Sequence, residues 1–138
     1  MDNAEVDTIG ELDAALAAAR HSAEAALATV ISLIGQLYPG ARYLTLSAGK
    51  GSAAISETLT AEETPYVLPA RDGKPMLAWV VGDRPLADLP EEAQPLLGHH
   101  AVDRTRTLNS ILTDCWRIGA RFPASSIRRH STVRLTLR

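Results

Sequence analysis

One repeating pattern constrains this chain more than any other: through the first third of the sequence, apolar residues fall at alternating spacings of three and four. Such a heptad seam is typical of a long α-helix that packs along its length. The pattern predicts one helix over residues 8–37, with Thr8 and Glu11 as the two ends of a capping box. The helix is expected to end before Pro39, which cannot continue it.

The middle of this seam is built from alanine, so a packing partner can approach the helix closely there. We expect that partner to be a second copy of the helix, which predicts a homodimer, or else another protein. The alternative is that the stripe packs within the chain, since alanine is also the best helix former. The residues expected to form the seam are Leu12, Leu16, Ala19, Ala23, Ala26 and Val30.

Composition places the chain among soluble globular domains. Its 138 residues are 46% hydrophobic and 22% charged, which fits a single domain spanning residues 1–138. No apolar run approaches the ~20 residues of a membrane span. The acidic N-terminus does not resemble a signal peptide, and the single cysteine, Cys115, cannot form an internal disulfide. We expect a cytoplasmic protein without membrane association, and its wealth of arginine and alanine is typical of GC-rich bacteria or their phages.

The remaining two thirds of the sequence predict an α+β fold. Apolar alternation favours a four-stranded antiparallel meander within residues 42–82, then a second helix over residues 100–119 and a C-terminal strand over residues 131–138. That last strand is expected either to complete the sheet or to pair with the sheet edge of a neighbouring molecule. The meander's strands are expected at residues 42–48, 53–60, 65–70 and 76–81, with turns at 49–52 and at Asp72-Gly73. Gly119 is expected to end the second helix.

Charge is distributed unevenly along the chain: residues 1–69 carry a net −6 and residues 103–138 a net +6. Such polarity is typical either of a polyanion-binding end or of two ends that neutralise each other. A short helix after Pro123 would let the C-terminal third form a helix-turn-helix with a wing. The residues expected to contact a nucleic acid are then Arg117, Arg121, Arg128, Arg129, His130 and Arg134.

No motif predicts catalysis, a cofactor or a metal, so we expect a protein that is not an enzyme. Residues 49–52 lack the spacing of a phosphate-binding loop and precede a strand. His99, His100 and Asp103 supply too few ligands for a zinc site. Cys115 lies on the apolar stripe of the second helix, which predicts a buried, inert thiol.

Three functional hypotheses follow. The first is a non-enzymatic, homodimeric interaction or regulatory protein, and the second is nucleic-acid binding. The third is a small-molecule-binding, sensor-like domain, for which Tyr66 and Trp79 are candidate pocket residues, although both are also expected in a plain core. The order of long helix, residues 37–47 and antiparallel sheet resembles GAF-type ligand-sensing domains. In those domains a helix feeds the first strand and often serves dimerisation, but the resemblance carries over no binding residue.

Overall fold

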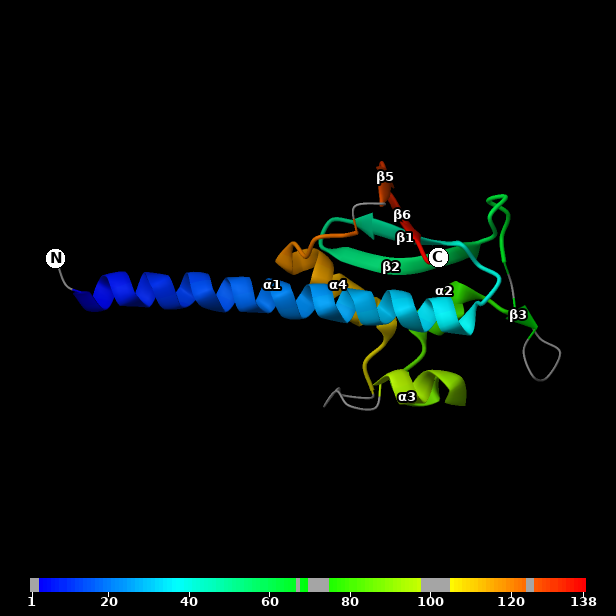
Figure 1. Ribbon diagram of the computed structural model, residues 1–138, viewed down its shortest axis with the longest axis horizontal. Helices are drawn as coiled ribbons and strands as arrows, with labels where there is room; N and C mark the ends of the chain where they lie inside the picture. Colours follow the sequence, from blue (N-terminus) through cyan, green and yellow to red (C-terminus); the bar gives the residue numbers. More distant parts are fainter. Residues whose placement is uncertain (1–2, 67, 70–74, 98–104, 124–125) are drawn as a thin grey trace.

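The computed structural model describes residues 3–66, 68–69, 75–97, 105–123 and 126–138, which form one body with a projecting helix (Figure 1). Its elements are α1 (Asn3–Leu37), β1 (Tyr43–Gly49), β2 (Ser52–Leu59), β3 (Leu68–Pro69), β4 (Pro75–Met76), α2 (Ala78–Asp83), α3 (Gln94–Leu97), α4 (Leu108–Ile118), β5 (Ile127–Arg129) and β6 (Thr132–Thr136), with single 3₁₀ turns at Leu86–Asp88 and Glu91–Ala93. The predicted α+β class is confirmed: a long first helix, a four-stranded antiparallel sheet, further helices and a C-terminal strand are all present.

The main sheet has the strand order β2-β1-β6-β5, so strands from the two ends of the chain meet at its centre. β1 and β2 form the hairpin predicted from the sequence, and its turn contains Gly51 with a left-handed φ of 79°. β6 pairs with the other edge of β1, where Leu46 lies opposite Val133. The C-terminal strand therefore completes this chain's own sheet.

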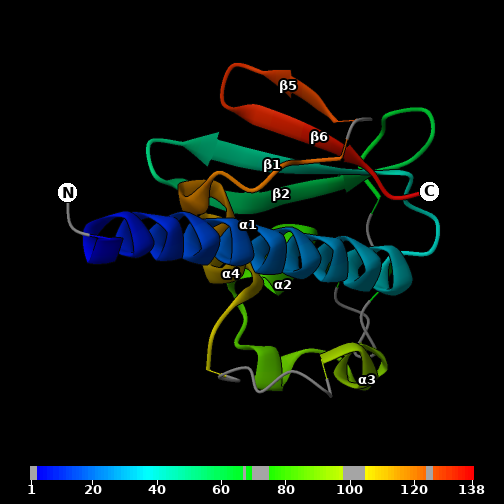
Figure 2. The same cartoon turned by 60° about the vertical axis from the view of Figure 1, so that its left-hand side comes forward.

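The helices α1, α2 and α4 cover one face of this sheet, and the core lies between the two layers (Figure 2). Leu44 and Leu46 of β1, together with Val133 and Leu135 of β6, are buried against these helices. Side chains alternate between the two faces of a strand, so their sequence neighbours lie on the opposite face. We call that opposite side the outer face, and no helix in the described part of the chain covers it.

Only the C-terminal half of α1 belongs to this body. Val30 is 3% exposed and Leu33 is fully buried. The carbonyl oxygens of Gly35 and Tyr38, at the end of the helix, accept hydrogen bonds from the Arg138 guanidinium. A cation at a helix C-terminus satisfies free carbonyl groups and complements the helix dipole. Arg138, which follows β6, thus links the end of α1 to the sheet through hydrogen bonds.

The helix α4 covers the free edge of β2 with polar side chains spaced four residues apart. The Asn109 Oδ1 atom accepts a hydrogen bond of 2.8 Å from the Ile55 amide. Thr113 both accepts from the Ala53 amide and donates to the Ala53 carbonyl. Arg117, one turn further on, donates to the β1–β2 turn. An uncovered strand edge can pair with strands of other chains. The contacts from α4 prevent this, because they satisfy backbone groups on the free edge of β2.

Both long helices begin at residues other than those predicted. α1 starts at Asn3, so Thr8 lies inside the helix and does not cap it. No helix breaker separates the two positions, and the acidic residues between them suit the positive end of a helix dipole. For α4, Thr107 is the N-cap and forms a capping box with Ser110, while residues 98–104 lie outside the described chain. The predicted end is confirmed, because Gly119 caps α4 with a φ of 75°.

The predicted strand over residues 76–81 is wrong, because residues 78–83 form the helix α2. A short apolar run cannot be assigned to a strand or to a buried helix by periodicity alone. Gly82 lets α2 approach α4, since a Cβ atom there would lie 2.6 Å from the Asn109 Oδ1 atom. The predicted strand at 65–70 shrinks to β3, which pairs with β4 outside the main sheet, and Asp72-Gly73 lies outside the described residues.

We predict that Asn109→Ala lowers the free energy of unfolding by about 1–3 kcal/mol, because the Ile55 amide loses its acceptor at a covered edge. Asp83 loses its 2.7 Å bond from the Asn109 amide at the same time. Urea unfolding of the purified variant measures this change. Asp114→Asn is the control on the same helix, since an exposed ion pair contributes about 1 kcal/mol or less. Equal effects of the two substitutions would contradict the role given to Asn109.

Candidate functional site

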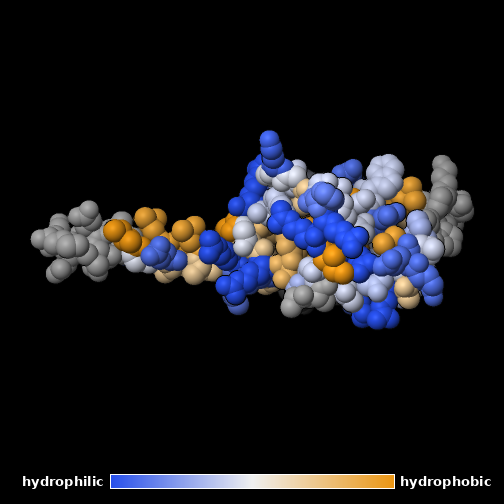
Figure 3. All heavy atoms as spheres, turned by 90° about the horizontal axis from the view of Figure 1, so that it is seen from above, coloured by the Kyte–Doolittle hydropathy of each residue, from blue (hydrophilic) through white to orange (hydrophobic). Residues whose placement is uncertain are grey.

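Five large apolar side chains are exposed in the described chain, and three of them lie on the part of α1 that projects from the body (Figures 1 and 3). We call residues 3–22 the arm. Ile9, Leu12 and Leu16 are 58%, 60% and 55% exposed. Their spacing places them on one side of the helix. Single exposed apolar side chains are ordinary, but an aligned set on a free helix is a surface that a partner can cover.

The seam predicted from the sequence is divided between this surface and the core. Leu12 and Leu16 are exposed, whereas Val30 is buried and unavailable to a partner. α4 meets α1 between these positions, where the Cys115 thiol donates to the Ala23 carbonyl at 3.3 Å. The three alanines of the seam, Ala19, Ala23 and Ala26, are half-buried. One continuous stripe thus changes from a free surface to a core contact along a single helix.

A hollow of ≈ 360 Å³ opens beside α1 where the arm meets the body. Leu27, Ile31 and Phe122 supply its apolar lining. At its rim the Glu24 carboxylate accepts a hydrogen bond of 3.2 Å from the Arg121 amide. This hollow therefore combines an apolar lining with polar groups of Glu24 and Arg121.

The helix predicted after Pro123 is wrong for the residues that the structure describes. Residues 127–129 form the strand β5, which pairs with β6 across a turn at His130 and Ser131. His130 has a left-handed φ of 52°. The chain is extended here because β5 pairs with a strand that is itself fixed to β1. The described residues of this region therefore form no helix-turn-helix. Arg128, Arg129, His130 and Arg134 lie on a β-hairpin instead, whereas Arg117 lies on α4 and Arg121 follows that helix.

Three of the six residues predicted to contact a nucleic acid bind other groups of the same chain instead. Arg117 donates to the turn between β1 and β2. The Arg128 guanidinium lies 4.6 Å from the centre of the Trp116 ring. Arg134 forms an ion pair with Glu63. Since Glu63 belongs to the acidic part of the sequence, the charge polarity is partly neutralised inside the molecule.

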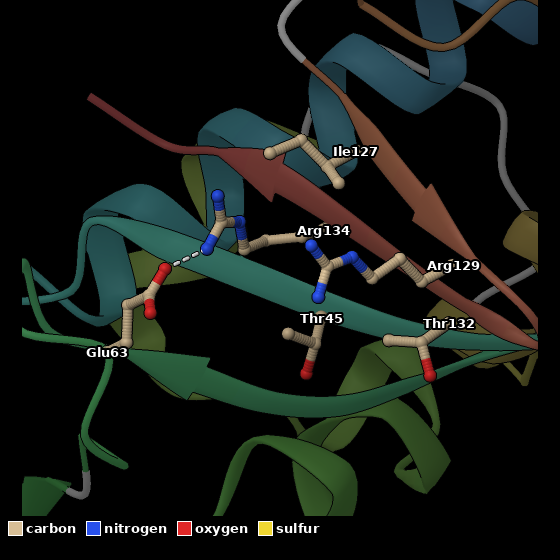
Figure 4. A pocket seen from close by; sticks show the side chains of 6 residues that line it. All are labelled: Thr45, Glu63, Ile127, Arg129, Thr132 and Arg134. Carbon is tan, nitrogen blue, oxygen red and sulfur yellow. Dashed lines mark hydrogen bonds and ion pairs between the residues drawn. The ribbon is translucent and has the colours of Figure 1, made fainter.

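The other three predicted contacts, Arg121, Arg129 and His130, are exposed. Arg129 helps to line a hollow of ≈ 330 Å³ on the outer face, shown in Figure 4. Of the two guanidinium groups at this hollow, that of Arg134 is paired with the Glu63 carboxylate, so the Arg129 guanidinium is the group available to bind an anion. The residues lining it are Thr45, Glu63, Ile127, Arg129, Thr132 and Arg134. Sequence reasoning did not bring Thr45 and Glu63 to this site, because their position depends on the strand order.

The hypothesis of a small-molecule pocket is not supported by Tyr66 and Trp79, because these two side chains do not enclose a common site. Trp79 is 52% exposed on α2, so the expectation that it lies in the core is wrong. Tyr66 packs edge-on against Tyr38 with ring centres 6.2 Å apart. The Tyr38 hydroxyl donates to the Met76 carbonyl at 3.0 Å, and burial raises the pKa of Tyr38 to about 12, with a smaller opposing effect from Arg84. The rings of Tyr38 and Tyr66 are therefore part of the packing around the end of α1.

Cys115 is buried in the core, as predicted. Burial, reinforced by the Asp114 carboxylate, raises the pKa of the Cys115 thiol, and Arg106 opposes this in part. A nucleophilic cysteine needs the reverse, namely a lowered pKa and access to a substrate. His99, His100 and Asp103 lie outside the described residues, and within the described ones no three potential metal ligands cluster.

We predict that Cys115 in the native protein reacts with a thiol reagent on the order of 100-fold more slowly than in denaturant, since both burial and a low thiolate fraction protect it. The rate of colour release at pH 8, with and without denaturant, measures the difference. Equal rates in the two conditions would mean that α4 does not shield the thiol.

The chain was compared with protein-family models, with curated proteins and with solved structures, and it matches none of them. The likeness of its first elements to GAF-type domains therefore carries no functional conclusion. Among the described residues, no helix is both long and apolar enough to cross a membrane.

Proposed function

We propose that this protein is a self-associating interaction module that uses the arm of α1 to bind a second copy of itself. The observation that carries the proposal is the exposed stripe of Ile9, Leu12 and Leu16, which continues the stripe that packs in the core. Full burial of a leucine or isoleucine side chain contributes roughly 1.5–3 kcal/mol. A pair of arms would remove six such side chains from water, counting three on each copy.

The shape of the arm supports the same function. α1 has 35 residues and is about 50 Å long at ~1.5 Å per residue. Isolated helices are marginally stable in water, and tertiary packing usually supplies most of their stability. The arm has no packing partner among the described residues beyond the point where α4 ends (Figure 1). A second arm would supply that packing and would give a regulatory protein a means of coupling two bodies.

We predict that the protein elutes as a dimer at micromolar concentration and that Leu12→Glu raises the dimer Kd by about 30-fold or more, since a charge then lies in the centre of the contact. Size-exclusion chromatography with light scattering, over a range of concentrations, measures both. Ala14→Glu is the matched control, because Ala14 is exposed on the side of the arm away from the stripe. A strict monomer, or equal effects of the two glutamates, would overturn the proposal.

A second candidate function is nucleic-acid binding on the outer face of the sheet. Arg129 and His130 are exposed at the end of the β5–β6 hairpin, and neither side chain has an ion-pair or hydrogen-bond partner within the described residues. Basic side chains on a two-stranded hairpin suit the phosphates of a nucleic-acid groove. The hollow beside them is lined by Arg129 and by the Arg134–Glu63 ion pair, so its net positive charge comes from Arg129.

For this second function we expect binding of a labelled DNA or RNA duplex that weakens steeply with salt, because neutralised phosphates release counterions. Arg129→Ala should weaken binding by about threefold to tenfold, measured by fluorescence anisotropy. Arg121→Ala removes the same charge beside α1, away from the outer face, and should have a smaller effect. Binding that is absent, or that is insensitive to both salt and Arg129, would exclude this function.

A further inference from the structure

We infer that Glu63 competes with phosphate for Arg134 on the outer face: its carboxylate holds this arginine in the free protein, and a nucleic-acid phosphate takes its place on binding. This inference rests on the nucleic-acid function proposed above as the second candidate. The hollow of ≈ 330 Å³ brings both side chains together with Arg129 (Figure 4). The chain thus fills part of its own phosphate site with a carboxylate.

Arg134 is held in a position that suits a phosphate ligand. Its guanidinium carbon lies 4.5 Å from the centre of the Tyr43 ring, and its side chain is 27% exposed. A guanidinium group stacked on a ring is pre-organised, so it loses little freedom when it donates to a ligand. Among the described residues, the acceptor that it binds is Glu63, through the Nη1 atom. The other N–H groups of Arg134 can therefore donate to a second acceptor.

Arg129 brings a second guanidinium group to the same hollow. It lies opposite Thr132 in the β5–β6 pair, two positions from Arg134 along β6 and on the same face. Diagonal neighbours of this kind are about 7–8 Å apart, which long side chains can span. A phosphate in the hollow can accept hydrogen bonds from both arginines, whereas the Glu63 carboxylate binds Arg134 alone. Because charge-assisted bonds to several N–H groups are the strong ones, the phosphate is the better ligand.

Glu63 occupies a backbone position at which a turn normally has glycine. Residues 60–64 form a hairpin loop in which the Glu63 amide donates to the Thr60 carbonyl at 2.9 Å, and the Thr60 amide donates to the Thr64 carbonyl at 2.8 Å. The φ of Glu63 is 62°, the left-handed conformation for which such three-residue loops favour glycine. A side chain kept at a strained position indicates a use for that side chain.

The Glu63 carboxylate can leave Arg134 without loosening its turn. Within the described residues, the bonds that close the turn come from its backbone and from the Thr60 and Thr64 hydroxyls, whose oxygens lie 2.7 Å apart. The Glu63 side chain is 58% exposed, and an exposed ion pair contributes little to stability. A phosphate that binds both arginines therefore displaces only a weak contact.

Neutralising the carboxylate tests this competition. Glu63→Gln should lower the Kd for a labelled DNA duplex by about threefold to tenfold, measured by fluorescence anisotropy. Glu62→Gln is the matched control, since it makes the same charge change at an exposed residue of the same turn that does not line the hollow. It should change the Kd by less than about twofold. In an Arg134→Ala background, Glu63→Gln should act no more strongly than Glu62→Gln, because the competition has been removed.

Glycine at position 63 separates binding from folding. Glu63→Gly removes the carboxylate and suits the left-handed φ, so the affinity for the duplex should rise as in Glu63→Gln while the urea midpoint of unfolding does not fall. A lower midpoint with an unchanged Kd would mean that the pair with Arg134 is only structural, and would overturn the inference.

The same titrations distinguish failure of the inference from failure of the function. No binding by the parent protein or by either Glu63 variant would overturn the second candidate function and this inference with it. Salt-sensitive binding that depends on Arg129, but is equal in the parent, Glu63→Gln and Glu62→Gln, would overturn the inference alone. Binding that appears only in the two Glu63 variants would support it, because the carboxylate then blocks the site in the parent.

Discussion

The packing of the C-terminal half of α1 on the sheet is the interaction on which the rest of this structure depends. Leu33 and Ile34 are completely buried there, in the core that α1 shares with α4 and the sheet. The same contact fixes the direction of the arm, because a helix is stiff over a few turns beyond the point where it is held. Arg138 strengthens the hold at the far end by binding the last carbonyl groups of α1. A free arm on an anchored helix is therefore a consequence of how the core is built.

Arginine has two separate roles in the C-terminal third. Arg117, Arg128 and Arg134 bind a backbone turn, an aromatic ring and a carboxylate, so their charge helps to hold the sheet to its surroundings. The planar guanidinium group suits all three tasks, since it can donate several hydrogen bonds and stack on a ring. Arg129 remains exposed on the outer face. The net charge of the sequence does not distinguish the structural arginines from the exposed one. The contacts of each side chain are needed to tell them apart.

Local patterns in the sequence predict the local features of this fold. The heptad spacing indicates α1 and its end, the alternation around residues 49–52 indicates the β1–β2 hairpin, and Gly119 marks the end of α4. The strand order could not be predicted, since the pairing of β6 with β1 joins opposite ends of the chain and no local pattern encodes it. The same applies to the outer-face hollow, which brings Glu63 beside Arg134. For α2, an apolar run of strand length forms a short helix that buries one side and exposes Trp79 on the other.

The two surfaces proposed for function do not compete for space. The stripe of the arm belongs to α1, which lies on the inner side of the sheet, whereas Arg129 and Arg134 line a hollow on the outer face (Figures 2 and 4). Pairing of arms would thus leave both outer faces of a dimer accessible. A dimer with two weak cationic faces binds one long polyanion more tightly than a single face does, because the second contact becomes intramolecular. Self-association through the arm would therefore raise the affinity of the weakly basic β5–β6 hairpin for a polyanion. The two candidate functions are in this way compatible within one dimer.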